Sequence, residues 1–193
     1  IPLVTLGTFL LWFGWFGFNG FSQLAMGTFD DVNAISKIAV NTHLAGAAGT
    51  VTAAVISRLL GGKTDIIMML NGALAGLVAI TAEPLTPSPL FAILVGSIGS
   101  LIMYFGTKFL ESKKIDDVVG AIPVHMFAGI FGTLVVPMTN SDTSFGTQLT
   151  GVISVCVFSF ILSYITFKVL KVTIGLRISS QAEKLGTDVA EIG

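Results

Sequence analysis

The sequence predicts an all-α membrane protein, a transmembrane bundle of six helices. Of its 193 residues, 53% are hydrophobic and only 11% are charged, whereas charged residues make up about 25% of an average soluble domain. The mean hydropathy is +0.89. A helical span needs roughly 20 apolar residues, so a chain of this length has room for about six spans. The net charge of −1 argues against nucleic acid as a partner, because phosphate binding needs a basic surface.

Six apolar runs follow one another along the chain, and we expect each to form one span. Glycines three or four residues apart, such as Gly14 with Gly17 and Gly72 with Gly76, indicate closely packed helices, because small residues let two backbones approach. The proline cluster at 84–89 marks an external turn. The runs are residues 3–25, 38–60, 66–82, 90–110, 118–138 and 147–170.

The basic residues predict the orientation of these spans. All but one of the ten Lys and Arg residues lie at the end of the second, fourth or sixth run or directly after it. Lys37 is the exception, and its set of connections carries Asp30, Asp31, Glu83 and Asp142 instead. Because basic residues favour the cytoplasmic side of a membrane, we predict that both termini are cytoplasmic.

The fifth run contains a histidine far from any other charge. Asp116 and Asp117 precede the run and suit the N-terminus of a helix. Counted from Val118 at the α-helical rise, His125 lies roughly 10 Å into the hydrocarbon. An ionisable group at that depth is a functional-site hypothesis. The alternative is a neutral imidazole that holds two helices together by a hydrogen bond, and this run alone leaves both interpretations open.

The first and second runs carry further polar and aromatic candidates. Trp15, Phe18 and Ser22 are three and four residues apart, so on a helix they share one face. Such a face can hold a small cation through the ring quadrupoles and a hydroxyl. The alternative is a pair of interfacial aromatic residues beside a hydrogen-bonded serine. For His43, in the second run, we expect an interhelical or interfacial hydrogen bond.

The chain has one cysteine, Cys156, which lies in an apolar run. A single cysteine cannot form an internal disulfide, and we expect neither a metal cluster nor a cofactor. The sequence starts at Ile1 without an initiator methionine, a charged n-region or a cleavage site, so no signal peptide is indicated. We expect the chain to be part of a longer protein.

Five segments read, in order, LLWFGWFGFNG from Leu10, NTHLAGAAG, NGALAGLVAITA, the run containing DDVVGAIPVH, and GLRISSQAEKLGTD near the end. Together they resemble the C-terminal half of the ammonium transporter (Amt/Mep/Rh) family, from its sixth to its eleventh transmembrane helix and into the cytoplasmic tail. The resemblance implies one half of an inverted-repeat fold plus the final bracing helix. Residues 1–174 would form the partial transmembrane domain and residues 175–193 a cytoplasmic tail, without the family's first five helices.

The resemblance also assigns roles to single residues. His125 is similar in position to the second of the family's two pore histidines. Phe18 resembles one of the two phenylalanines that close the outer end of the pore, Trp15 the pore-lining tryptophan, and Ser22 the serine of the external ammonium site. A group of tail residues resembles the regulatory segment beneath the family's trimer: Gly175, Leu176, Arg177, Glu183, Gly186 and Asp188.

The expected function is transport of ammonium or ammonia across a cell membrane, through a hydrophobic pore of which this chain supplies the C-terminal half. The resemblance implies that the partners are ammonium or ammonia, the lipid bilayer, two further copies in a homotrimer, and a PII-class nitrogen signalling protein. It implies no enzyme activity. The alternative is an ammonium-sensing membrane module of a larger signalling protein. An intramembrane serine protease is disfavoured, because the run at 96–100 lacks the glycine-any-serine-glycine nucleophile motif.

Overall fold

The computed structural model describes residues 1–191, and every regular element among them is a helix, which confirms the all-α prediction. Ile192 and Gly193, the end of the expected tail, lie outside the described residues. The chain divides into two compact units, Ile1–Leu149 and Thr150–Gly193. The elements are α1 (Pro2–Gly20), η1 (Phe21–Gln23), α2 (Phe29–Gly61), α3 (Ile66–Thr81), α4 (Pro89–Ser112), η2 (Ile122–Phe127), α5 (Ala128–Val135), η3 (Val136–Met138), α6 (Phe145–Thr173), α7 (Ser180–Leu185) and α8 (Thr187–Glu191).

Side-chain caps determine where the helices begin. α2 starts well ahead of the predicted run at 38–60, because Thr28 and Asp31 form a reciprocal capping box, which satisfies free backbone N–H groups. The Asp65 carboxylate caps α3. The Ser88 hydroxyl caps α4, whose first residue is Pro89. Capping thus explains the starts of α3 and α4, which match the apolar runs. It also explains the start of α2, which does not.

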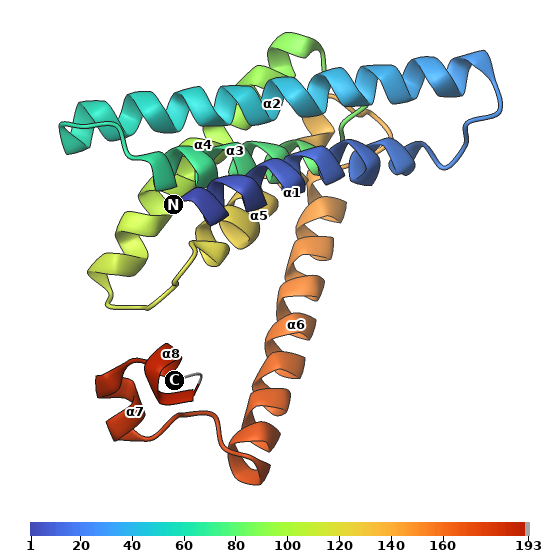
Figure 1. The fold of residues 1–193 in the computed structure, drawn as a ribbon. Helices are drawn as coiled ribbons and strands as arrows, with labels where there is room; N and C mark the ends of the chain where they lie inside the picture. Colours follow the sequence, from blue (N-terminus) through green and yellow to red (C-terminus); the bar gives the residue numbers. More distant parts are fainter. Residues whose placement is uncertain (192–193) are drawn as a thin grey trace. The chain divides into compact units, whose positions relative to one another are not determined.

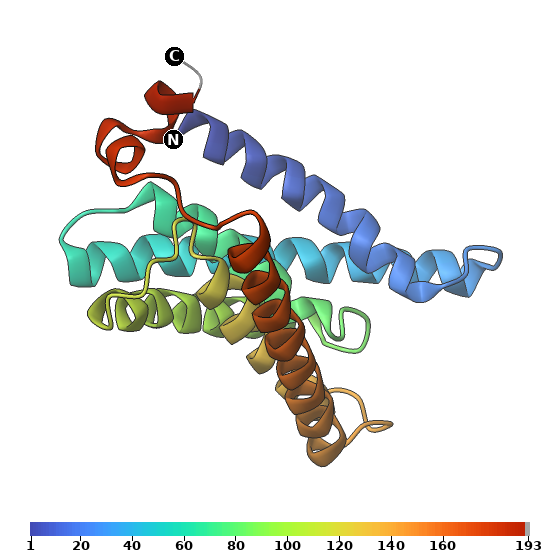
Figure 2. The same ribbon diagram turned by 90° about the horizontal axis from the view of Figure 1, so that it is seen from below.

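Three helices form the centre of the first unit. α2, α3 and α4 pack against one another, α1 packs on α2 and α3, and α5 packs on α3 and α4 (Figure 1 and Figure 2). α3 is only 16 residues long, or roughly 24 Å by the α-helical rise, which is less than the hydrocarbon core of about 30 Å. Four segments of the described chain are long and apolar enough to cross a membrane: Pro2–Gln23, Phe29–Gly61, Pro89–Ser112 and Phe145–Thr173.

The glycines of α3 bring these backbones together. A Cβ at Gly76 would collide with the carbonyl oxygen of Ala45 on α2. A Cβ at Gly72 would lie 2.7 Å from the carbonyl oxygen of Gly49, also on α2, and 2.9 Å from the Ser100 hydroxyl on α4. The Ser100 Oγ itself donates to that Gly49 carbonyl at 2.8 Å. Close packing at Gly72 and Gly76 is therefore confirmed.

The fifth predicted run forms three short helices instead of one. Val118 and Val119 form a turn, and Gly120 takes a left-handed φ of 75°, which glycine adopts without a steric cost. A π-helix (η2) follows, then α5 and a 3₁₀ turn (η3). The helical part of the run therefore begins at Ala121, later than predicted.

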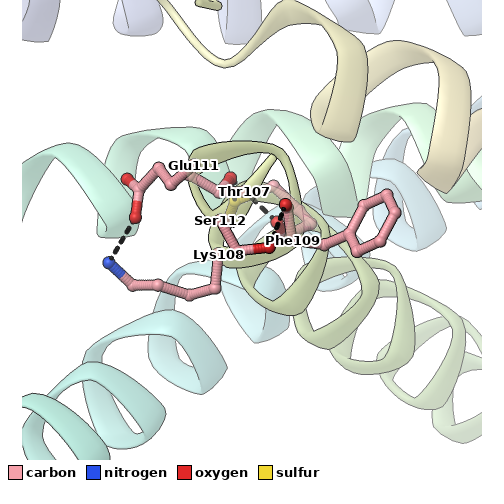
Figure 3. Close-up of polar contacts among 6 residues, drawn as sticks. Thr107, Lys108, Phe109, Glu111 and Ser112 are labelled. Carbon is pink, nitrogen blue, oxygen red and sulfur yellow. Dashed lines mark hydrogen bonds and ion pairs between the residues drawn. The ribbon is translucent and has the colours of Figure 1, made fainter. Parts of the chain in front are cut away.

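The last turns of α4 are held by local contacts (Figure 3). Lys108 and Glu111 form an exposed ion pair at 3.0 Å, which contributes at most about 1 kcal/mol. Hydroxyl groups also donate to carbonyl oxygens one turn earlier, from Ser112 to Phe109 at 2.7 Å and from Thr107 to Met103 at 2.9 Å. These contacts stabilise the last turns of α4, which precede the loop that leads to His125.

The second unit contains most of α6 and the two tail helices. α6 is a single helix of 29 residues without a buried residue. It ends at Thr173, and Gly175, two residues later, has a φ of 84°. The Ser179 hydroxyl caps α7, and α7 packs against α8.

Candidate functional site

Trp15 and Phe18 form an aromatic pair near the end of α1. Their ring centroids are 6.1 Å apart and the planes meet at 61°, an edge-to-face arrangement. The Trp15 indole N–H donates to the Thr81 hydroxyl on α3 at 2.7 Å, and Thr81 donates to the Leu77 carbonyl. Trp15 is thereby fixed to the bundle, whereas Phe18 is 65% exposed and available to a ligand or to another segment.

A buried polar pair beside Phe18 sets the rotation of α1. The Asn19 amide donates to the Thr42 hydroxyl on α2 at 3.0 Å, and both side chains are 0% exposed. An unpaired buried amide is costly, so this bond disfavours rotation of α1 about its own axis.

Ser22 lies just beyond α1, so the predicted face that it shares with Trp15 and Phe18 crosses from an α-helix into a 3₁₀ helix. α1 ends at Gly20, and Ser22 lies in the 3₁₀ helix η1. The α-helical spacing used to align Ser22 with Phe18 therefore stops before it. Ser22 is exposed, and the next residue, Gln23, donates to the Asp31 carboxylate at 3.0 Å. The start of α2 thus holds the segment that carries Ser22.

His125 lies in the π-helix η2, with its side chain exposed. Pro123 and Val124, directly before it, are buried. The helical segment starts at Ala121 instead of Val118, so the count of α-helical residues from Val118 does not apply to His125. Within the described residues the imidazole has no hydrogen-bond partner, and the interhelical bond considered as an alternative is not found in this part of the chain.

His43 contacts aromatic rings on α1. Its ring centroid lies 5.6 Å from that of Trp12 and 6.2 Å from that of Phe16. The predicted hydrogen bond is therefore replaced by ring packing between α2 and α1. Such packing holds the two helices together without a polar partner.

The structure brings some of the candidate residues together and keeps others apart. Trp15 and Phe18 are in contact, whereas α1 and η2 have no close backbone approach within the described residues. Trp15 and Val124 do pack on the same apolar cluster, which includes Leu77 of α3. Trp15 and the residue directly before His125 therefore share one apolar cluster.

The tail residues form a local structure of their own. Arg177 and Glu183 make an ion pair at 3.2 Å, with both side chains exposed. Gly175 and Gly186 take left-handed φ values of 84° and 94°, and Asp188 lies in the first turn of α8. The glycines therefore allow the sharp turns before α7 and after it. Among residues 1–191 no group of three or more His, Cys, Asp or Glu side chains is placed to hold a metal ion.

Sequence reasoning missed the polar side chains that position the site. Thr42 and Thr81 receive hydrogen bonds from α1, and Asn41 donates to the carbonyl oxygens of Pro84 and Pro87 at 3.0 and 2.9 Å. The available signal was an amide or hydroxyl inside an apolar run. That signal predicts that the side chain forms a hydrogen bond, but it does not identify the residue to which the bond is made.

This arrangement defines a multi-pass helical membrane protein that presents an aromatic pair and a histidine at its surface. The sequence profile of the ammonium transporter family matches residues 1–193, and the chain belongs to that family.

Individual relatives agree with this assignment. The chain is 40% identical to ammonium transporter Amt2 of Archaeoglobus fulgidus over 99% of this chain and 44% of the relative. It is 35% identical to Amt1 of Methanocaldococcus jannaschii over 98% of this chain and 49% of the relative. The chain thus spans less than half the length of these relatives.

Two solved structures share the fold. A protein described as a sensor Amt protein superposes with a TM-score of 0.90 at 37% identity, over 100% of this chain and 49% of that one. Mep2 of Candida albicans superposes with a TM-score of 0.83 at 27% identity, over 98% of this chain and 45% of that one.

Proposed function

We propose that this chain supplies one half of an ammonium transporter, with His125 and Phe18 on the wall of a hydrophobic pore. The carrying observation is that both side chains are exposed while the residues beside them, Val124 and Asn19, are buried. An exposed imidazole between apolar helices needs a polar or aqueous surrounding. The names of the relatives and the length they share with this chain support an opposing half that would enclose these groups.

The proposed transport begins with capture of ammonium at Trp15, Phe18 and Ser22. The ring faces attract the cation and so offset part of its lost hydration. Because a charge is costly in an apolar channel, ammonium would lose a proton near the gate and cross as ammonia. His125 would then hold or relay the small polar species on its way. The species transported overall would be ammonia alone or ammonia together with a proton.

The wider setting is also part of the proposal. The protein would lie in the cell membrane with both termini in the cytoplasm, act as a homotrimer when complete, and bind a PII-class signalling protein through its tail. The basic residues support the orientation, and the turns at Gly175 and Gly186 support a folded tail. Cysteines at Lys63 and Lys113 should react with an impermeant reagent only from the cytoplasmic side, and a cysteine at Asp31 only from outside. Reversed labelling would overturn the orientation.

Reconstitution in liposomes tests the half-transporter. The 193-residue chain alone should give no methylammonium uptake above protein-free vesicles, because transporters of this type carry their path between two repeats. Combination with the first half should restore uptake. His125→Ala should then abolish it without loss of folded protein, whereas the control His43→Ala should retain it. Uptake by the chain alone, sensitive to His125→Ala, would mean that copies of this chain form a pore by themselves.

A second candidate is an ammonium sensor, which the solved sensor Amt protein favours through its 37% identity and TM-score of 0.90. A sensor would bind ammonium at the same aromatic pair but would not pass it. Ammonium-dependent quenching of Trp15 fluorescence in the combined protein, without any methylammonium uptake, would support the sensor over the transporter.

A further inference from the structure

The turn before η2 is attached to the central helix by one side chain. The amide of Asn71 on α3 donates to the Val119 carbonyl oxygen at 3.1 Å. Asn71 is 8% exposed, so the bond forms where competition from water is small. This is a long-range contact between the middle of the bundle and the loop that precedes His125.

The fit between Asn71 and this turn is tight. Gly120 takes a φ of 75°, and a Cβ there would lie 2.7 Å from the Asn71 Nδ2. Both the conformation and the space therefore require glycine at 120. The Asn71 amide thus contacts the turn twice, through the Val119 carbonyl and along the Gly120 backbone.

Hydrogen bonds continue from this turn into η2. The Asp117 carboxylate accepts from the Ala121 and Ile122 N–H groups at 2.9 and 2.8 Å. The Gly120 carbonyl accepts from the Val124 N–H at 3.1 Å. Val124 is the residue directly before His125. The position of the turn therefore determines where the π-helix starts and how it is rotated.

We propose that Asn71 is the positioning residue for His125. It fixes the turn at Val119 and Gly120, and the turn sets the direction in which the imidazole projects from η2. Without the anchor, the turn can shift and the segment can rewind from π-helix to α-helix, which re-aims every side chain on it. The predicted effect on transport rests on the proposed role of His125. The positioning of the His125 side chain by Asn71 does not depend on that role.

The chain allows a clean measurement of the His125 environment, because it contains two histidines. In a His43→Gln chain labelled at histidine, every imidazole signal comes from His125. Asn71→Ala removes the anchor. Asn71→Asp keeps the size of the side chain, but a carboxylate cannot donate to a carbonyl oxygen. Both should shift or split the His125 ring signals in NMR spectra.

Asn140→Ala is the matched control. The Asn140 amide donates to the Glu83 carboxylate at 2.7 Å and so anchors another loop beyond the end of α5. Its loss should leave the His125 signals in place. Unchanged signals in both Asn71 variants, or equal shifts in the control, would overturn the proposal. If neither Asn71 variant gives folded protein, Asn71 is a folding residue and the proposal is wrong.

Transport separates this proposal from the proposed function. In the combined protein, Asn71→Ala should lower methylammonium uptake by at least about tenfold, since small misplacements of a working group carry large costs. Shifted His125 signals with full uptake would retain Asn71 as the positioning residue and overturn the pore role of His125. Lost uptake with unshifted signals would overturn the positioning role.

Discussion

α1 and α3 are both almost wholly apolar, yet they occupy opposite environments. α3 is buried along most of its length by α2, α4 and α5, whereas only Thr8, Asn19 and Gly20 are buried in α1. Phe13 of α1 is 78% exposed. Apolar composition therefore identifies a membrane helix without telling which of its faces meets protein. The exposed face of α1 is free for lipid or for a further helix.

The glycines show the same difference. Gly72 and Gly76 of α3 are in backbone contact with α2, as predicted from their spacing. In α1, a Cβ at Gly14 would have nothing within 4 Å, and one at Gly17 would meet only the Phe21 ring of the adjacent η1 at 3.7 Å. Close packing is therefore not found at Gly14 and Gly17 within residues 1–191. Spacing of small residues reveals a surface that can pack closely, and the partner decides whether it does.

The largest expected effect on stability concerns the glycines of α3 and α1. Gly76→Leu should destabilise the protein by about 3 kcal/mol, the upper end of the usual cost of overpacking, because the new side chain has no space beside the Ala45 carbonyl. Gly14→Leu, in the same type of helix, should not destabilise the protein, and the better helix propensity of leucine should add up to about 1 kcal/mol to the free energy of unfolding. Thermal unfolding in detergent, followed by size-exclusion chromatography, measures both. Equal destabilisation of the two variants would mean that α1 is packed in a way the structure does not show.

An intermediate effect is expected where α1 is attached. Asn19→Ala removes the bond to Thr42 and leaves a buried hydroxyl without its donor, which costs roughly 1–3 kcal/mol. The control is Thr8→Ala, also buried on α1, whose hydroxyl donates to the Val4 carbonyl of its own helix. Hydrogen exchange should rise along α1 in Asn19→Ala and stay unchanged in α3. Protection of α1 equal to that of the control would show that Asn19 does not hold this helix.

The sequence predicted most of the fold, because apolar runs and caps are local signals. Each of the six runs contains a helix, and Trp15 and Phe18 meet through simple helical spacing. The prediction of one helix for the fifth run was wrong. The turn at Gly120 and the hydrogen bonds that Asp117 accepts move the helix start to Ala121, and the π-helix changes the number of residues per turn. The partners of Trp15 and Asn19 also escaped prediction. Trp15 and Thr81 are 66 residues apart in the chain, and no local pattern connects them.

The smallest expected effect distinguishes two exposed phenylalanines of α1, one in the proposed ammonium site and one outside it. Phe18 and Phe13 are both exposed on α1. Phe13→Ala should alter the free energy of unfolding by less than about 0.5 kcal/mol, and Phe18→Ala by about 0.5–1.5 kcal/mol, because it also loses the ring contact with Trp15. Only Phe18 contacts Trp15 in the proposed ammonium site. A lost cation–π contact of about 0.5–1 kcal/mol corresponds to a rise of roughly two- to fivefold in the apparent methylammonium concentration at half-maximal uptake. Phe13→Ala should leave that concentration unchanged. A matching rise in both variants would assign the effect to general loosening of α1, and no rise in either would remove Phe18 from the ammonium site.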